Sequence, residues 1–231
     1  MAPTISNLAL TAGPFSPNGD GVKDTITITA SIDEYATWVI TIKDSEGTLV
    51  RTFTGSGMSI EQVWDGKDGG EVVPEGEYTV YVDAVDVVGN PATQFSATVV
   101  VDVTAPTAPV ADLLVVTTNP PGTPDTIEGL EGAVEANALV TIYSNPSLEP
   151  TYVIDTTSAD ETGTFTATDI GDDAYTEVWV TATDPAGNES PATSKTNPPT
   201  LPLAIILIGI LIAIVVVVVA TLTALLRRKK R

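Results

Sequence analysis

Short stretches of alternating hydrophobic and polar residues run through the first half of the chain, as in half-buried β-strands. The clearest are residues 26–29 (Ile-Thr-Ile-Thr), 38–42 (Trp-Val-Ile-Thr-Ile) and 78–82 (Tyr-Thr-Val-Tyr-Val). Turn-forming clusters of Asp, Gly and Pro separate them, and no helical periodicity intervenes. This spacing predicts an antiparallel β-sandwich over residues 4–103.

A second group of strand-like stretches follows. We expect strands at residues 139–143, 152–156, 163–167 and 176–183. Within the last of these, Val178, Val180 and Ala182 fall on one face, because side chains alternate along a strand. The pattern predicts a second sandwich over residues 107–195, followed by a Pro-containing spacer over residues 196–202.

One long apolar segment breaks this pattern near the C-terminus. The 24 residues from Leu203 to Leu226 contain no charged side chain. As a helix they would extend about 36 Å, which is enough to cross a hydrocarbon core of about 30 Å with some tilt. A buried core helix fits poorly, because such helices seldom run this far without a polar face. We therefore predict a transmembrane helix, with the lipid bilayer as its partner.

Five basic residues, at positions 227–231, follow this segment directly. Basic residues beside a transmembrane helix favour the cytoplasmic side, so the sandwiches are expected outside the cytoplasmic membrane in a single-pass topology. The chain opens on Met1 without a signal peptide, which by itself would suit a tail-anchored protein with cytosolic domains. We therefore expect that the chain either lacks its leader or is the C-terminal part of a longer protein. Ala-Pro-Thr at residues 2–4 repeats Ala-Pro-Thr at the domain junction, residues 105–107, and an interdomain joint at the start would imply a further domain ahead of the first.

Charge and missing residue types exclude several functions. The part preceding the basic tail holds 30 acidic and five basic residues, a net charge of −25, which repels nucleic acid and attracts cations. The chain has no Cys and no His, which removes His-dependent triads, Cys nucleophiles and the usual zinc sites. We expect no enzymatic activity, no nucleic acid and no small-molecule substrate. The absence of disulfides favours a prokaryotic surface protein.

Specific motifs in the first sandwich resemble a known family. They are Phe-Ser-Pro-Asn-Gly-Asp-Gly at residues 15–21, Trp-Asp-Gly-Lys-Asp at 64–68, Pro-Glu-Gly-Glu-Tyr at 74–78 and Asp-Val-Val-Gly-Asn at 86–90. Together they resemble the Ig-like domain of flagellar hook-capping proteins and the related C-terminal domains of gliding-motility surface proteins. This resemblance implies a structural or targeting module.

The second sandwich is similar to the tandem bacterial Ig-like repeats of surface adhesins. The motifs that carry this similarity are Asp-Val-Thr-Ala-Pro at residues 102–106, Ile-Glu-Gly at 127–129, Gly-Thr-Phe at 163–165 and Ala-Thr-Asp-Pro-Ala-Gly-Asn at 182–188. The fold class implied for the chain is all-β: two tandem Ig-like antiparallel sandwiches followed by one transmembrane helix. Members of that family form stalks, and some bind calcium where neighbouring domains meet.

Acidic loops supply candidate ligands for a structural Ca²⁺ ion. Oxygen ligands at alternating positions, with Gly at the bend, suit calcium, and the loop at residues 18–24 has this pattern. An Asx turn without metal explains the same residues. Both Asp-x-x-Gly-Asn motifs have the same alternative, since they suit a tight turn. The candidate metal ligands are Asn18, Asp20, Asp24, Asp86, Asp102 and Asp184.

Two functions fit these observations. The first is a membrane-anchored structural stalk or adhesion-type module that holds a functional region at the cell envelope. The alternative is an accessory subunit of a larger membrane or surface complex, in which the sandwiches bind other surface or membrane proteins. The three Trp residues (Trp38, Trp64 and Trp179) could form a sugar-binding platform, but Trp residues on sandwich strands more often belong to the core.

Overall fold

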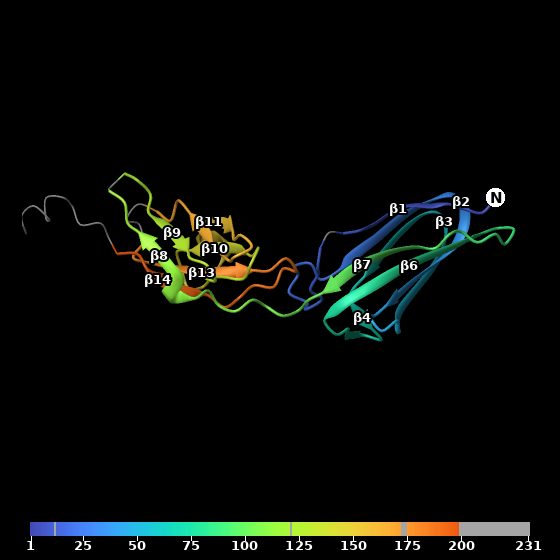
Figure 1. The fold of residues 1–231 in the computed structure, drawn as a ribbon, viewed down its shortest axis with the longest axis horizontal. Helices are drawn as coiled ribbons and strands as arrows, with labels where there is room; N and C mark the ends of the chain where they lie inside the picture. Colours follow the sequence, from blue (N-terminus) through green and yellow to red (C-terminus); the bar gives the residue numbers. More distant parts are fainter. Residues whose placement is uncertain (12, 121, 172–174, 199–231) are drawn as a thin grey trace, which may run out of the picture.

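The computed structural model describes residues 1–11, 13–120, 122–171 and 175–198. Two β-rich lobes follow one another along the long axis (Figure 1). The predicted transmembrane segment at residues 203–226 and the basic tail lie outside the described residues. Among the residues that are described, no helix is long and apolar enough to cross a membrane.

The first lobe consists of seven strands: β1 (Ile5–Leu10), β2 (Ile26–Lys43), β3 (Leu49–Trp64), β4 (Lys67–Asp68), β5 (Glu71–Val72), β6 (Gly76–Asp86) and β7 (Phe95–Val101). The main sheet has the order β1-β2-β6-β7, with β3 also paired to β2, while β4 and β5 form a small hairpin. All of these pairs are antiparallel.

Strands β2 and β3 fold this sheet into two layers. The first half of β2 pairs with β1, the second half pairs with β6, and the register shifts between Ser31 and Ala36. The sequence predicts two separate strands at residues 26–29 and 38–42, whereas the structure joins them in one strand of 18 residues. We call the arched end of the first lobe, where β2 and β3 cross between the layers, the tip.

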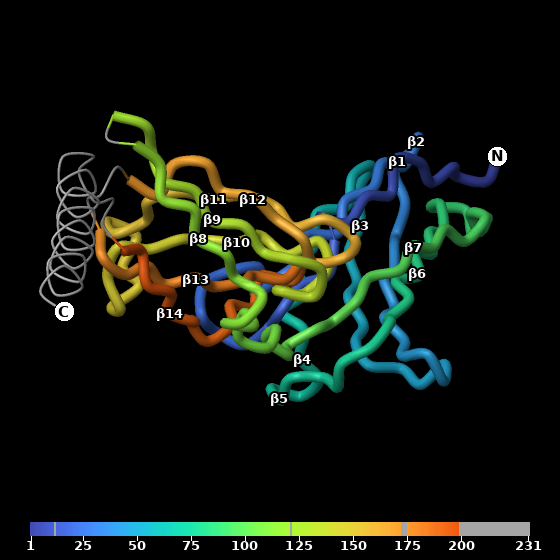
Figure 2. The backbone as a smooth tube through the Cα atoms, turned by 60° about the vertical axis from the view of Figure 1, so that its left-hand side comes forward, coloured from blue at the N-terminus to red at the C-terminus, as the bar shows by residue number. Residues whose placement is uncertain are grey.

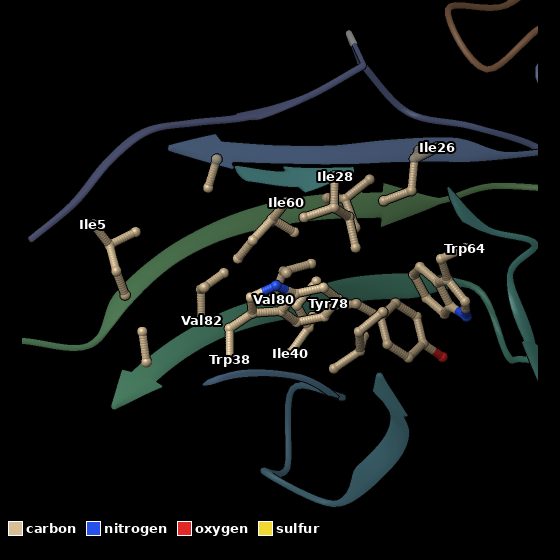
Figure 3. Packing of buried hydrophobic residues seen from close by; sticks show 14 of the residues in the cluster. Ile5, Ile26, Ile28, Trp38, Ile40, Ile60, Trp64, Tyr78, Val80 and Val82 are labelled. Carbon is tan, nitrogen blue, oxygen red and sulfur yellow. The ribbon is translucent and has the colours of Figure 1, made fainter. Parts of the chain in front are cut away.

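The core of the first lobe lies between these layers (Figure 3). Alternate residues of β2 are buried on both sides of the arch, among them Ile26, Ile28, Ile40 and Ile42. Trp64 is completely buried, and its ring makes edge-on contacts with Phe15 and Tyr78 at centroid distances of 5.4 and 5.5 Å. Aromatic pairs in this geometry stabilise a core beyond the area that they bury.

The second lobe has two facing sheets and its own core. One sheet has the order β11-β10-β13-β14 and the other β12-β9-β8. The elements are η1 (Ala111–Leu113), β8 (Leu114–Thr117), β9 (Thr126–Gly129), β10 (Leu139–Tyr143), η2 (Pro150–Tyr152), β11 (Val153–Ser158), β12 (Phe165–Ala167), β13 (Glu177–Thr183) and β14 (Thr193–Thr196).

Strand β10 and the inward face of β13 agree with the sequence prediction. β10 has the predicted bounds, and Val178, Val180 and Ala182 of β13 are all completely buried. The last strand, β14, ends at Thr196, and Asn197 after it is buried. The packed part of this lobe therefore reaches the first residues of the expected spacer.

Candidate functional site

The two sandwiches meet at a hydrogen-bonded joint, which is the best-defined polar site between them. On the side of the first sandwich, the joint consists of the loop at residues 15–24 between β1 and β2. On the side of the second, it consists of the turn at residues 184–188 after β13. Figure 2 shows the loop, in blue, at the end of the first lobe that faces the second.

The base of the loop is fixed to the first sandwich. The backbone N–H of Phe15 donates to the carbonyl of Val100 at 3.0 Å, and the N–H of Asp102 donates to the carbonyl of Phe15 at 3.1 Å. Gly66, at φ +64°, leaves space for Pro17, because a Cβ on Gly66 would lie 2.5 Å from the Pro17 ring. The loop therefore leaves the core beside the point where the chain exits toward the second domain.

Side-chain oxygens within the loop bind its own backbone. Asp24 accepts hydrogen bonds from the N–H groups of Gly19 at 2.6 Å and Gly21 at 2.8 Å. Asp20 accepts from the N–H of Val22 at 2.7 Å, and Asn18 Oδ1 accepts from the N–H of Asp20 at 3.0 Å. These are the bonds of an Asx-type turn, so the loop holds its shape through its own contacts.

The turn after β13 is closed by a single carboxylate. Asp184 Oδ1 accepts from the N–H groups of Gly187 at 2.8 Å and Asn188 at 2.9 Å, and its Oδ2 accepts from the Asn188 amide at 2.8 Å. Gly187 has a φ of +100°, a conformation that glycine adopts without strain. The Asn188 amide is thereby held facing the loop of the first sandwich.

Asn188 is the central residue of the joint. Its Oδ1 accepts hydrogen bonds from the Ser16 hydroxyl at 2.6 Å and from the Asn18 amide at 3.3 Å. Its Nδ2 donates to the carbonyl of Asp102 at 3.0 Å. Asn188 is only 2% exposed and Ser16 is fully buried, so water does not compete freely for these bonds. The buried hydroxyl of Ser16 and the buried amide of Asn188 thus satisfy each other across the domain boundary.

Two further contacts surround this centre. The Lys23 ammonium donates to the carbonyl of Pro185 at 2.7 Å. Gly187 lies so close to Val22 that a Cβ on the glycine would come within 2.9 Å of Val22 Cγ1. The glycine is therefore required both by its backbone angle and by the approach of the neighbouring domain.

The linker is held as well. Glu75 accepts hydrogen bonds from the Thr104 hydroxyl at 2.6 Å and from the Val103 N–H at 2.9 Å. The bond from Thr104 and, to a smaller extent, the bond from Val103 lower the pKa of Glu75, so its carboxylate is charged at neutral pH. The residues that connect the sandwiches are thus bonded to the first sandwich.

The joint is acidic. Glu135 lies beside it, and burial raises the pKa of Glu135, with the charges of Asp184 and Asp102 raising it further. Thr104, Pro106, Val134 and Glu135 line a cavity of about 410 Å³ at this point. The carboxylates of the joint therefore repel one another across the domain boundary.

The six candidate metal ligands do not gather at one point. Asn18, Asp20 and Asp24 share the loop, and Asn188 links Asp102 and Asp184 at the joint through its amide. Asp86 lies at the tip, the opposite end of the first sandwich. Among the described residues there is no group of three or more Asp, Glu, His or Cys side chains placed to hold a metal ion. The calcium hypothesis stays a prediction.

The sequence did not predict the two residues whose hydrogen bond lies at the centre of the joint. Ser16 and Asn188 are separated by 172 positions, and neither is unusual in its local sequence. The repeated Asp-x-x-Gly-Asn motif predicts a turn at this position. It does not predict that the turn contacts the loop of the other sandwich. The Trp residues form no common surface, because Trp38 and Trp64 are buried in the core of the first sandwich and Trp179 lies on β13 of the second.

Comparisons with known proteins agree with a surface module of Ig-like domains. Residues 10–97 match the family described as the CHU_C type IX secretion signal domain. No curated protein sequence matches the chain. The FN1–FN3 domains of chicken CNTN1 superpose with a TM-score of 0.50 at 14% identity, over 85% of this chain and 66% of that one. This likeness supports the sandwich fold in both halves of the chain.

Two bacterial structures also match the chain, with lower TM-scores. They are a 1.5-MDa ice-binding adhesin, in a structure concerned with its retention at the host cell surface, and the BSP domain of a biofilm-associated protein. Their TM-scores are 0.36 and 0.29, with identities of 16% and 18%, each over 86% of this chain. This chain spans 65% and 31% of those chains. The family match and the sandwich fold support a surface-associated module.

Proposed function

We propose that this protein is a membrane-anchored structural stalk whose two Ig-like sandwiches hold a functional region at a distance from the cell envelope. The observation that carries the proposal is the joint between the sandwiches. A stalk transmits position only if its domains keep a defined angle, and here Asn188 of the second sandwich bonds to the buried Ser16 hydroxyl and to the Asp102 carbonyl at the end of the first. Each such buried group left without a partner would cost about 1–3 kcal/mol, which favours the closed joint.

The proposed anchor is the uncharged segment at residues 203–226, with the basic residues at 227–231 in the cytoplasm. The partner of the segment is the lipid bilayer. The net charge of −25 on the remainder opposes contact with anionic headgroups and so favours sandwiches that stand away from the surface.

Protease protection tests this topology. Protease is added to intact, wall-stripped cells that produce the full chain with an epitope tag after Arg231. We expect the sandwiches to be digested, while the tag and a short membrane fragment survive until the membrane is lysed. A cytosolic protein serves as the control for intact cells. Sandwiches that resist digestion until lysis would instead place them in the cytosol.

The alternative function, an accessory subunit of a membrane or surface complex, is favoured by one specific observation. Val87 and Val88, at the tip, are 81% and 78% exposed, and adjacent exposed apolar residues indicate protein contacts. Stable co-purification with fixed partner proteins, lost on Val87→Asp, would support the subunit. Monodisperse full chain without partners would support the stalk.

A structural Ca²⁺ ion is the cofactor that the acidic loops favour. Its proposed ligands are Asn18, Asp20 and Asp24 in the loop, with Asp86, Asp102 and Asp184 near the domain ends. Extracellular calcium modules bind at about 10⁻⁴–10⁻³ M, so 1 mM calcium would stabilise the fold by about 0.4–1.4 kcal/mol per site. Thermal melts of the full chain in calcium, magnesium and chelator at matched ionic strength measure this. Equal melting temperatures in all three solutions would show that these motifs are turns that bind no calcium.

We also propose that the chain is not an enzyme. The proposal is supported by the lack of His and Cys, without which the common nucleophile–base pairs cannot be assembled. Purified full chain should release no product from glycan or peptide substrates. Reproducible turnover that is lost on changing particular carboxylates would overturn this.

A further inference from the structure

The tip of the first sandwich carries a second copy of the turn that forms the joint. Asp86 Oδ1 accepts from the N–H of Asn90 at 2.8 Å, and Asp86 Oδ2 accepts from the Asn90 amide at 2.7 Å. The corresponding distances for Asp184 and Asn188 are 2.9 and 2.8 Å. The glycines also agree, with φ of +95° at Gly89 and +100° at Gly187. The two turns are therefore the same structure at the same place in each domain.

The two turns differ in what they contact. Asn188 Oδ1 accepts the Ser16 hydroxyl of the neighbouring domain, whereas Asn90 Oδ1 has no hydrogen-bond partner within the described part of the chain. At the position before the glycine, Ala186 is fully buried, but its counterpart Val88 is 78% exposed. The tip thus presents the same amide geometry with an open acceptor and a larger apolar surface.

The surroundings of the two turns also correspond. The chain enters each sandwich through Ala-Pro-Thr, and both Pro3 and Pro106 are buried. Figure 1 shows the N-terminus and the turn between β6 and β7 at the end of the first lobe that faces away from the second. The exposed side chains of Tyr35 and Met58, on the arch of β2 and β3, widen the apolar surface at this end.

We propose that the tip is a docking surface for another Ig-like domain of the same type, joined ahead of the first sandwich. That domain would present a Ser-Pro-Asn-Gly loop like the one at residues 16–19. Its serine hydroxyl would donate to Asn90 Oδ1, as Ser16 donates to Asn188, and an aliphatic residue in the place of Val22 would cover Val87 and Val88. The occupant is thus defined by the loop that already fits the equivalent turn.

A second copy of this chain is not the occupant. The only matching loop described in the chain, at residues 15–24, is already bound in cis to the turn at residues 184–188. A head-to-tail contact between copies would have to break the joint, including the buried bond between Ser16 and Asn188. The docking domain must therefore bring a loop of its own.

A fusion that supplies such a loop tests the proposal. Residues 1–104 are placed directly ahead of Ala2 of the full chain, which recreates the Asp-Val-Thr-Ala-Pro-Thr sequence of the natural joint at residues 102–107. Because the chain contains no cysteine, a single pair can be introduced cleanly. The pair is Ser16→Cys in the added copy and Asn90→Cys in the original, and the readout is the rate of disulfide formation in purified protein.

We expect this pair to oxidise within about tenfold of the rate of Ser16→Cys with Asn188→Cys in the natural chain, since both are intramolecular at high effective concentration. In the control pair, Thr93→Cys is placed at the tip of the added copy and Asn90→Cys stays at the tip of the original. The length of the added sandwich then separates the two thiols, so this pair should oxidise far more slowly. Val87→Asp and Val88→Asp, both at exposed positions, are then added to the original copy. They should slow disulfide formation by the tip pair at least about tenfold and leave the rate of the Ser16→Cys, Asn188→Cys pair unchanged.

Three results would overturn the proposal. The first is a tip pair no faster than the control pair, and the second is a tip pair indifferent to the Val87→Asp and Val88→Asp changes. The third is equally fast intermolecular cross-linking of the chain without the added copy, carrying Ser16→Cys and Asn90→Cys, which would make a second copy the occupant. Amide hydrogen exchange at Val88 and Asn90 in the cysteine-free fusion provides an independent readout, with slower exchange expected on docking.

The inference rests on the proposed stalk for its biological meaning, since it names what the stalk carries. The two can fail separately. Cross-linking is measured in purified protein and does not depend on the membrane topology. Protease protection is measured in cells and does not depend on the tip.

Discussion

The two sandwiches share a fold but fill their interiors differently. The first has an aromatic core in which Phe15, Trp64 and Tyr78 contact one another, and Trp38 lies over Gly55. In the described core cluster of the second, Phe165 is the one aromatic residue and packs among mostly small and β-branched side chains. The second sandwich also buries more polar groups, with Asp125 and Asn197 inside the lobe and Asn188 at the joint.

This difference shows two ways to stabilise a domain of about 100 residues. The first sandwich removes large apolar surfaces from water, which is worth about 25 cal/mol per Å². The second fixes its loops with buried hydrogen bonds, whose net contribution is about 1 kcal/mol each but whose loss costs more. We therefore expect the first sandwich to be destabilised most by mutations that remove side-chain volume from its core. The second should be destabilised most by mutations that leave buried polar groups without hydrogen-bond partners.

Removal of the Trp64 ring should have the largest effect. Trp64→Ala leaves a cavity in the middle of the aromatic cluster, and such changes cost about 3–5 kcal/mol. Urea unfolding of the full chain, followed by circular dichroism, should show an earlier transition for the first sandwich and an unchanged one for the second. Phe165→Ala is the matched change and should shift only the second transition. Equal shifts of both transitions would show that the cores are not independent.

Removal of the Asp125 carboxylate should come next. This side chain is completely buried and accepts hydrogen bonds from the Asn119 N–H at 2.7 Å and from the Asn197 amide at 3.1 Å. Asp125→Ala leaves the buried Asn197 amide and the partly buried Asn119 N–H without this acceptor. An unsatisfied buried donor costs about 1–3 kcal/mol, so the second sandwich should unfold at a clearly lower urea concentration. Asp112→Ala, at an exposed position, should stay within about 0.5 kcal/mol of the parent. If the two variants behave alike, the polar interior contributes little.

The two equivalent turns allow a direct measurement of the joint. Asn188→Ala loses a turn bond and the contacts to Ser16 and Asp102, while Asn90→Ala loses only the turn bond. We expect Asn188→Ala to be the more destabilising by about 1–2 kcal/mol in thermal unfolding. It should also widen the range of interdomain distances measured between spin labels on the two sandwiches. Equal effects at both turns would mean that the joint adds nothing to the fold.

The smallest effect should come from charge at the joint. The pKa of Glu135 is raised above its ordinary value of 4.5, by burial first and then by Asp184 and Asp102. The folded state therefore holds a proton that the unfolded state has lost, and stability falls as the pH rises through this interval. Glu135→Gln should raise the melting temperature at pH 7 by about a degree, because the side chain is mostly exposed, and should have no effect near pH 4. A constant effect at both pH values would rule out charge as the cause.

Strand positions and turns could be predicted from the sequence wherever the local pattern was strong. The alternation at residues 38–42 and 78–82 gave strands within β2 and β6, and the predicted second-sandwich strand at residues 139–143 matches β10. β3 was not predicted, although it has 16 residues, because Thr, Ser and Gly dilute its alternation. Gly55 within it is required by the Trp38 ring, since a Cβ there would lie 2.2 Å from the ring.

The chain sequence by itself determined the elements whose cause is local. Alternating side chains select a strand, and Asp followed by Gly and Asn closes a tight turn with its own carboxylate, at residues 86–90 and again at 184–188. Only the tertiary structure decided that one of these turns is buried in a joint and the other exposed. That outcome depends on Ser16 meeting Asn188 across 172 positions, and a contact at that separation exists only once both sandwiches have folded and met.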